Sequence, residues 1–102
     1  MAELWNCDGT KVLNVQLPKD VSKRGDKMRE YVGGYFEFVY LSNDKILVVD
    51  ENGMGKSMNP QTKDKYKHNK FATKLYEEYG GATMFPKKIV GNVLVVSKDE
   101  IE

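Results

Sequence analysis

The sequence is poor in the residue types that usually mark an active site or a covalent framework. Its single cysteine, Cys7, excludes an intramolecular disulfide and a zinc site built from several thiolates. Its single histidine, His68, lies in a run of lysines, and no serine or cysteine is placed to act as its nucleophilic partner. We therefore expect a protein that is not an enzyme and that binds neither a metal nor a cofactor.

Long apolar stretches and an excess of one charge are also missing. No apolar run reaches the length of about 18 residues that a membrane-spanning helix needs, and 16 Lys and Arg against 15 Asp and Glu give a formal net charge of +1. A chain so close to neutral has no overall field for duplex nucleic acid or for a membrane surface, so an anion site would have to be local. We find no segment typical of a signal peptide and expect a cytosolic protein.

What is present predicts one α+β domain, because 102 residues suffice for a single core. The clearest element is a β-hairpin, in which apolar runs over residues 35–41 and 45–50 flank a short polar loop. A half-buried strand is predicted over residues 10–17, with Leu13, Val15 and Leu17 on one face. Residues 89–97 are apolar almost throughout, which favours a central strand with both faces covered. Residues 1–9 are expected to form an irregular lead-in or a short edge strand.

Two helices are predicted. The first begins at a cap on Asp20 or Ser22 and ends at the glycine pair 33–34. Its inward-facing residues would be Val21, Met28 and Val32. The second covers residues 69–79 and ends at the glycine pair 80–81, and residues 54–68 before it are expected to form a Lys-rich loop or insertion. The apolar stripe of this second helix consists of Phe71, Ala72, Leu75, Tyr76 and Tyr79.

The resulting order, strand-helix-strand-strand-helix-strand (βαββαβ), predicts a four-stranded, mostly antiparallel sheet with two helices on one face. The other face would remain exposed. Because two helices cannot cover all the apolar side chains of such a sheet, we expect self-association into a dimer or tetramer. Apolar side chains would point to both faces of the sheet from the Val-rich last strand and from four aromatic residues of the hairpin, Tyr35, Phe36, Phe38 and Tyr40.

Two acidic positions allow more than one interpretation. Glu37 stands among aromatic residues and shares a strand face with Val39 and Leu41. It is either a carboxylate at a solvated edge or one that points into a pocket, where a ligand or neighbour must offset its desolvation. The sequence Asp-Glu-Asn at 50–52 resembles the start of an acidic metal loop, but the later ligands are missing, which favours a turn.

The second helix carries the clearest local candidate for an anion site. A cap at Asn69 leaves the amides near Thr73 at the helix N-terminus, where anions are favoured, and Lys70 and Lys74 lie close by. Tyr66 and Phe71 offer flat surfaces on which a base could stack. The alternative is an ordinary capped helix with a solvated lysine face.

Gly91 and Asn92 interrupt the last apolar strand. A buried amide must be hydrogen-bonded to some partner, and the missing side chain at Gly91 allows close approach by backbone or ligand.

Three segments, VGGYFEFVYL with the following ILVVDENG, then NKFATKLY, then IVGNVLVV, resemble a family of small proteins of tailed phages that is catalogued as a domain of unknown function. The resemblance covers residues 13–96, in the same order. Residues 59–68 depart from the family pattern as a Lys-rich insertion before the helix. The positions that match the family's recurrent residues are Glu37, Asn69, Thr73 and Asn92, with Gly33, Gly34 and Gly91.

The resemblance implies a phage accessory protein made in the host cytoplasm. Phage proteins of this size include oligomeric sponges that sequester cyclic nucleotide signals of bacterial defence without cleaving them. The expected function is therefore capture of a cyclic oligonucleotide, such as cyclic GMP-AMP, at a subunit interface. The alternative is a protein-binding inhibitor of a defence or restriction enzyme, which acts through the aromatic sheet face. The expected ligand-binding residues are Tyr35, Glu37, Tyr66, Asn69, Lys70, Thr73, Lys74, Gly91 and Asn92.

Overall fold

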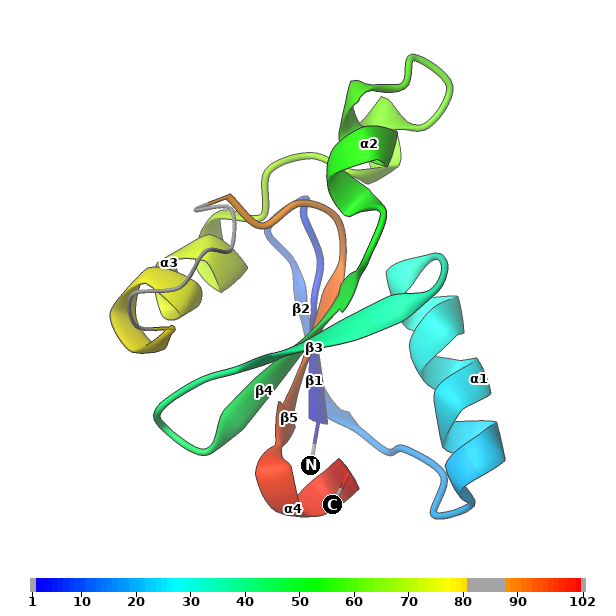
Figure 1. Cartoon of the computed structure of the whole chain (residues 1–102), viewed down its shortest axis with the longest axis vertical. Helices are drawn as coiled ribbons and strands as arrows, with labels where there is room; N and C mark the ends of the chain where they lie inside the picture. Colours follow the sequence, from blue (N-terminus) through cyan, green and yellow to red (C-terminus); the bar gives the residue numbers. More distant parts are fainter. Residues whose placement is uncertain (1, 81–87, 102) are drawn as a thin grey trace.

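A computed structural model describes residues 2–80 and 88–101 of the chain. Its centre is one antiparallel sheet with the strand order β2-β1-β5-β4-β3 (Figure 1). The predicted α+β class is confirmed, but the sheet has five strands instead of four. The strands are β1 (Ala2–Trp5), β2 (Lys11–Val15), β3 (Phe36–Tyr40), β4 (Lys45–Asp50) and β5 (Val93–Ser97).

The fifth strand comes from the start of the chain. Strand β1 pairs with β2 on one side and β5 on the other, so the prediction of a lead-in or an edge strand for residues 1–9 is wrong. Ala2 is fully buried, and Leu4 and Trp5 pack on opposite faces of the sheet. Four residues contain too few alternations to show a strand period in the sequence.

The two long helices lie on opposite faces of the sheet, not on one (Figure 1). Helix α1 (Val21–Val32) packs Met28 and Val32 against one face of β4 and β5, and helix α3 (Lys70–Tyr79) packs Ala72 and Tyr76 against the other. This arrangement follows from the strands themselves, because both β4 and β5 are buried on both faces. The uncovered sheet face that motivated the prediction of self-association is therefore not present.

Strand β2 departs from the predicted alternation at a bulge. Ala2 pairs with Val15 but Leu4 with Val12, so β2 contains one residue more than β1 between these pairs. Asn14 within the bulge has a positive φ of 61°. As a result Val15 is buried whereas Leu13 is 59% exposed, which corrects the predicted position of Leu13.

Helix α1 has the predicted ends. The Asp20 side chain accepts a hydrogen bond from the Lys23 amide (3.0 Å), and Gly33 has a φ of 94° while its amide donates to the Arg29 carbonyl. Met28 and Val32 are buried as predicted, but Val21 is 74% exposed, because the first turn of the helix has no apolar cover among the described residues.

The hairpin of β3 and β4 and the helix α3 are present as predicted from the strongest sequence patterns. Strand β5 is central and covered as predicted, but it begins only at Val93, and the preceding residues form a single bridge between Val90 and His68. The segment predicted as a Lys-rich loop contains regular structure, and a short helix follows β5. Residues 82–88, which the sequence predicts as a connector containing Pro86, lie outside the described residues except for Lys88. The additional elements are α2 (Gly53–Met58), the 3₁₀ helix η1 (Lys63–Lys65) and α4 (Lys98–Ile101).

Candidate functional site

Several residues singled out in the sequence converge on residues 88–92, the segment that leads into β5. The backbone amide of Asn69 donates to the Ile89 carbonyl (2.8 Å). The Thr73 hydroxyl oxygen accepts from the Ile89 amide (2.9 Å) and lies 3.3 Å from the Ile89 carbonyl oxygen. The Gly91 amide donates to the Lys67 carbonyl (2.9 Å). The N-terminal turn of α3 therefore binds this segment through its polar side chains and backbone.

Asn69 is the centre of this network. As predicted, its Oδ1 caps α3 by accepting from the Ala72 amide (3.1 Å). Its Nδ2 donates to the Trp5 and Gly91 carbonyl oxygens, both at 2.9 Å, and the residue is only 1% exposed. The side chain thus connects the end of β1, the start of α3 and the entry to β5, and its hydrogen-bonding groups are all committed within the protein.

The predicted phosphate site at the start of α3 has little room for a ligand. Thr73 is buried, its amide donates to the Asn69 carbonyl (3.0 Å), and His68 Nε2 lies 3.1 Å from its hydroxyl. Asn69 and Thr73 are therefore positioning residues in this structure. Lys70 and Lys74 on the same helix are exposed and remain available to an anion.

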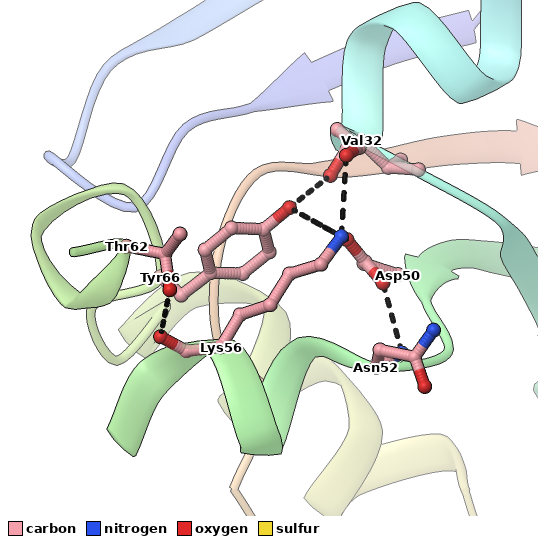
Figure 2. Close-up of polar contacts among 7 residues, drawn as sticks. Val32, Asp50, Asn52, Lys56, Thr62 and Tyr66 are labelled. Atoms are coloured by element: carbon pink, nitrogen blue, oxygen red, sulfur yellow. Dashed lines mark hydrogen bonds and ion pairs between the residues drawn. The ribbon is translucent and has the colours of Figure 1, made fainter. Parts of the chain in front are cut away.

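A second buried network joins Asp50, Lys56 and Tyr66 (Figure 2). The Asp50 side chain is 1% exposed, and its Oδ2 accepts from the Tyr66 hydroxyl (2.6 Å) and from Lys56 Nζ (2.7 Å). Its Oδ1 accepts from the Asn52 amide (2.8 Å), so the acidic sequence at 50–52 is a turn. The Tyr66 hydroxyl also lies 3.3 Å from the Val32 carbonyl oxygen, next to the end of α1.

Three glycines make room for this network. A Cβ atom on Gly33 would lie 2.4 Å from the Tyr66 hydroxyl, and one on Gly34 would lie 2.6 Å from Lys56 Nζ. A Cβ atom on Gly91 would lie 2.8 Å from the Tyr66 ring. The close approach that the sequence predicts at Gly91 is therefore made by the ring of Tyr66, and the glycine pair 33–34 both ends α1 and accommodates the cluster.

The cluster also shifts the pKa values of Lys56 and Tyr66. The hydrogen bond to Asp50 raises the pKa of Lys56, and burial raises the pKa of the Tyr66 phenol. At neutral pH an ammonium group and a neutral phenol therefore surround the carboxylate. Tyr66 is 6% exposed, and a base could stack on its ring only if the ring left this position.

Glu37 lies on the edge strand β3, and Tyr35 directly precedes this strand. Glu37 is half-buried opposite Val49 and lines a cavity of about 260 Å³ together with Glu51 and Lys88. Burial, followed by the charge of Glu51, raises the pKa of Glu37. Tyr35 is 70% exposed just before the strand.

Asn92 lines a larger groove of about 820 Å³ between the β1–β2 turn, the end of α1 and residues 56–66. Its Oδ1 accepts from the Cys7 amide (3.1 Å). Three carboxylates and two lysines line this groove, which disfavours a phosphate there. These charged residues are Asp8, Glu30, Asp64, Lys56 and Lys65.

A basic and aromatic surface lies on the other side of the β1–β2 turn. Lys11 Nζ is 4.0 Å from the centroid of the Trp5 ring and 4.6 Å from that of Phe71, and the two rings meet edge to face. Lys70 and His68 line an adjoining cavity of about 340 Å³. We call this the basic–aromatic surface and define it as Trp5, Lys11, His68, Lys70, Phe71 and Lys74.

No pattern in the sequence assigns Trp5 or Lys11 to a site. The pairing of Trp5 with Lys11 across β1 and β2 brings them together, and the position of α3 adds Phe71. The one signal in the sequence was a lone tryptophan in a polar context near a lysine, which by itself specifies no neighbour.

Within the described ranges, no group of three or more His, Cys, Asp and Glu side chains could hold a metal ion, and none of the helices is long and apolar enough to span a bilayer. Neither a known protein family, nor a curated protein, nor a solved structure matches this chain.

We predict that Asn69→Ala lowers the free energy of unfolding by about 3 kcal/mol, because the variant loses a helix cap and leaves two buried carbonyl groups without a donor. Urea unfolding followed by circular dichroism measures this loss. Asn59→Ala is the matched control, since the Asn59 side chain accepts from a nearby amide in the same way but is exposed. Equal losses in the two variants would contradict the central role of Asn69.

We also predict that Lys56→Met destabilises the protein by about 2 kcal/mol at neutral pH, because Asp50 stays buried without its cation. The loss should be smaller than for a fully buried pair, since the Lys56 side chain is 30% exposed. Lys27→Met is the control, because Lys27 forms an exposed ion pair with Glu30 on α1.

The effect of Lys56→Met should depend on pH. The folded pKa values of Lys56 and Tyr66 both lie above their usual values of 10.5 and 10.0, so their stabilisation is complete below these values and is lost as pH rises through the folded pKa. The difference in unfolding free energy between wild type and Lys56→Met should therefore shrink above about pH 10.5. A constant difference up to pH 12 (roughly the limit of such measurements) would contradict this linkage.

Proposed function

We propose that the protein is a non-enzymatic binding protein that captures a small phosphate-bearing nucleotide, of the cyclic oligonucleotide class that bacterial anti-phage systems use as signals. The observation that carries this proposal is the basic–aromatic surface, where Lys11 Nζ lies 4.6 Å from the centroid of the exposed Phe71 ring. Lys70 and Lys74 add two exposed cations, one residue before and three residues after Phe71 on the same helix. The resemblance of VGGYFEFVYL, NKFATKLY and IVGNVLVV to small phage proteins supplies the biological setting, a phage product that acts in the host cytoplasm.

The surface offers both kinds of contact that a nucleotide needs. Lys11, Lys70 and Lys74 can neutralise phosphate oxygens, and a base can stack on Phe71, which is 45% exposed. Stacking on an aromatic side chain contributes about 1–3 kcal/mol per base. Two carboxylates lie near the surface, and both are engaged within the protein. Glu3 Oε1 accepts from Trp5 Nε1 (2.9 Å), and Asp8 accepts from the Thr10 amide (2.9 Å) and hydroxyl (2.6 Å) in the β1–β2 loop.

The proposal changes the roles expected from the sequence. Lys70 and Lys74 keep a role in ligand contact, whereas Asn69, Thr73, Tyr66 and Gly91 hold the scaffold in place. Asn92 lies across the β1–β2 turn, in the groove that disfavours phosphate.

Within one copy of the chain, Tyr35 and Glu37 cannot contact a ligand that is bound by Lys11. They belong to the β3 edge of the sheet, and Lys11 belongs to the β2 edge. Four strand spacings separate these edges, about 19 Å.

The affinity required of a sponge suggests an assembly. A nanomolar Kd corresponds to about −12 kcal/mol, and a surface this open buries too little of a ligand to supply it. We therefore propose that a second copy covers the basic–aromatic surface and encloses the ligand, as most small-molecule sites are enclosed.

The second candidate is a protein-binding inhibitor of a defence or restriction enzyme. Phe36, Phe38 and Tyr40 favour it, because their rings form a row along β3 with centroids 5.4 and 6.4 Å apart. Such a row on an edge strand suits contact with another protein. Capture of a host protein without binding of any nucleotide would favour this candidate.

We predict that isothermal titration detects binding of at least one cyclic dinucleotide, with cyclic GMP-AMP as the first probe. Lys70→Glu and Lys74→Glu should each weaken the affinity by about tenfold or more, since each replaces a phosphate-binding cation with an anion. Lys27→Glu, on the outer side of α1, should leave the affinity unchanged. The absence of heat with every cyclic dinucleotide at micromolar protein would count against the proposal.

Chromatography of the ligand after long incubation distinguishes capture from catalysis. We expect the nucleotide to be recovered intact once the protein is denatured. Cleaved nucleotide whose amount grows with time would show an enzyme and would overturn the non-enzymatic part of the proposal.

A further inference from the structure

The outer edge of β3 carries backbone groups without partners in the described residues. In the β3–β4 ladder the Leu41 amide donates to the Lys45 carbonyl and the Glu51 amide to the Tyr35 carbonyl. Residues directly opposite each other in an antiparallel pair alternate between bonded and non-bonded pairs. The odd-numbered residues of β3 therefore bond to β4, and the even-numbered ones direct their N–H and C=O groups away from the sheet. These outward-facing residues are Phe36, Phe38 and Tyr40.

The two edges of the sheet differ in how well they are protected against pairing. Strand β2 has a bulge, a positive φ at Asn14 and Lys11 at its start, all features that prevent another strand from adding to an edge. Strand β3 pairs with β4 through five consecutive residues without a bulge, and it contains neither proline nor lysine. It is a regular, aromatic edge of the type that accepts a further strand.

We propose that two copies of this chain associate by antiparallel pairing of their β3 strands, with the twofold axis at Phe38. In this register Phe38 lies opposite Phe38 of the second copy, and Phe36 lies opposite Tyr40 of the second copy. All the outward-facing N–H and C=O groups of β3 then find partners, and the two five-stranded sheets become one continuous sheet.

Charge and existing hydrogen bonds exclude the neighbouring symmetric registers. An axis at Glu37 would place two like charges directly opposite each other, which destabilises a strand pair. An axis at Val39 would require the Ser42 amide to bond to the second copy, but this amide already donates to the Tyr79 carbonyl (2.9 Å). With the axis at Phe38, Glu37 lies opposite Val39 of the second copy, so the two Glu37 side chains are diagonal neighbours and not directly opposed.

The side chains also favour this partner. Phe36, Phe38 and Tyr40 point to the α1 face of the sheet, where α1 covers them only in part, and Tyr40 remains 57% exposed. Pairing at Phe38 joins the two rows into one group of aromatic rings that lie across the twofold axis. Aromatic pairs across strands contribute about 0.2–1 kcal/mol each beyond the backbone hydrogen bonds.

The proposal does not depend on the nucleotide, and its test needs none. Sedimentation velocity of the purified chain should show a reversible dimer with a Kd in the micromolar range, as expected for a small interface. Tyr40→Pro should raise this Kd by at least about tenfold, because it removes one outward amide per copy while leaving the ladder to β4 intact. Val21→Lys, at the exposed start of α1, should leave the Kd unchanged.

Cysteine trapping tests the register and does not require the variant to be as stable as wild type. In a Cys7→Ser background, Phe38→Cys should form a disulfide-linked dimer on mild oxidation, because directly opposed bonded residues lie about 5.5 Å apart at their Cα atoms. Val21→Cys, at the exposed start of α1, should form no disulfide-linked dimer under the same conditions. A protein that is monomeric at about 100 µM, or a dimer that survives Tyr40→Pro, would overturn the proposal. A wild-type dimer whose Phe38→Cys variant does not cross-link would overturn the register.

Discussion

The structure depends on the hydrogen bonds made by the backbone N–H and C=O groups of residues 88–92, which directly precede β5. Within residues 2–80 and 88–101, this segment forms a single isolated bridge, between Val90 and His68, so its other polar groups need partners from side chains. Asn69 and Thr73 supply most of them. Because β5 is the central strand of the sheet, a fixed entry to β5 also fixes the position of α3 on one face and of β1 at its side. Ligand binding is not needed to explain why such polar residues occur in an apolar context.

The Asp50–Lys56–Tyr66 cluster places a second constraint on the same region. A buried ion pair adds little net stability, since desolvation offsets much of the attraction, but it is costly to break once formed. The chief effect of the cluster is therefore to favour one conformation of this region over others. It holds residues 53–66 against the end of α1 and against Gly91, which is why a polar segment without an apolar stripe is ordered. A segment of this composition gives no such signal from its own residues.

The elements that the sequence predicted well are those with a local signature. The hairpin, the capped helix α3 and the central apolar strand each carry a period or a cap within a few residues. The opposite placement of the helices, the inner position of β1 and the bulge at Asn14 all depend on pairing between distant segments. The site shows the same division. Asn69, Thr73 and Gly91 could be identified as unusual from the sequence, but their partners Trp5, Ile89 and Tyr66 could not. Residues that hold the fold together were therefore predicted to bind a ligand.

The two proposed interfaces make different demands on the assembly. Pairing through β3 leaves the two basic–aromatic surfaces at the far ends of a joined sheet, near the two β2 edges. Nine strand spacings lie between those edges, about 40 Å, so neither surface can close over the ligand of the other. A dimer of this kind thus cannot enclose a nucleotide on its own. Enclosure would need a second contact near β2, where Val12 and Leu13 are exposed beside Lys11. Two independent twofold contacts close into a tetramer when their axes intersect at right angles, and such a tetramer is the smallest closed assembly in which both proposals hold together.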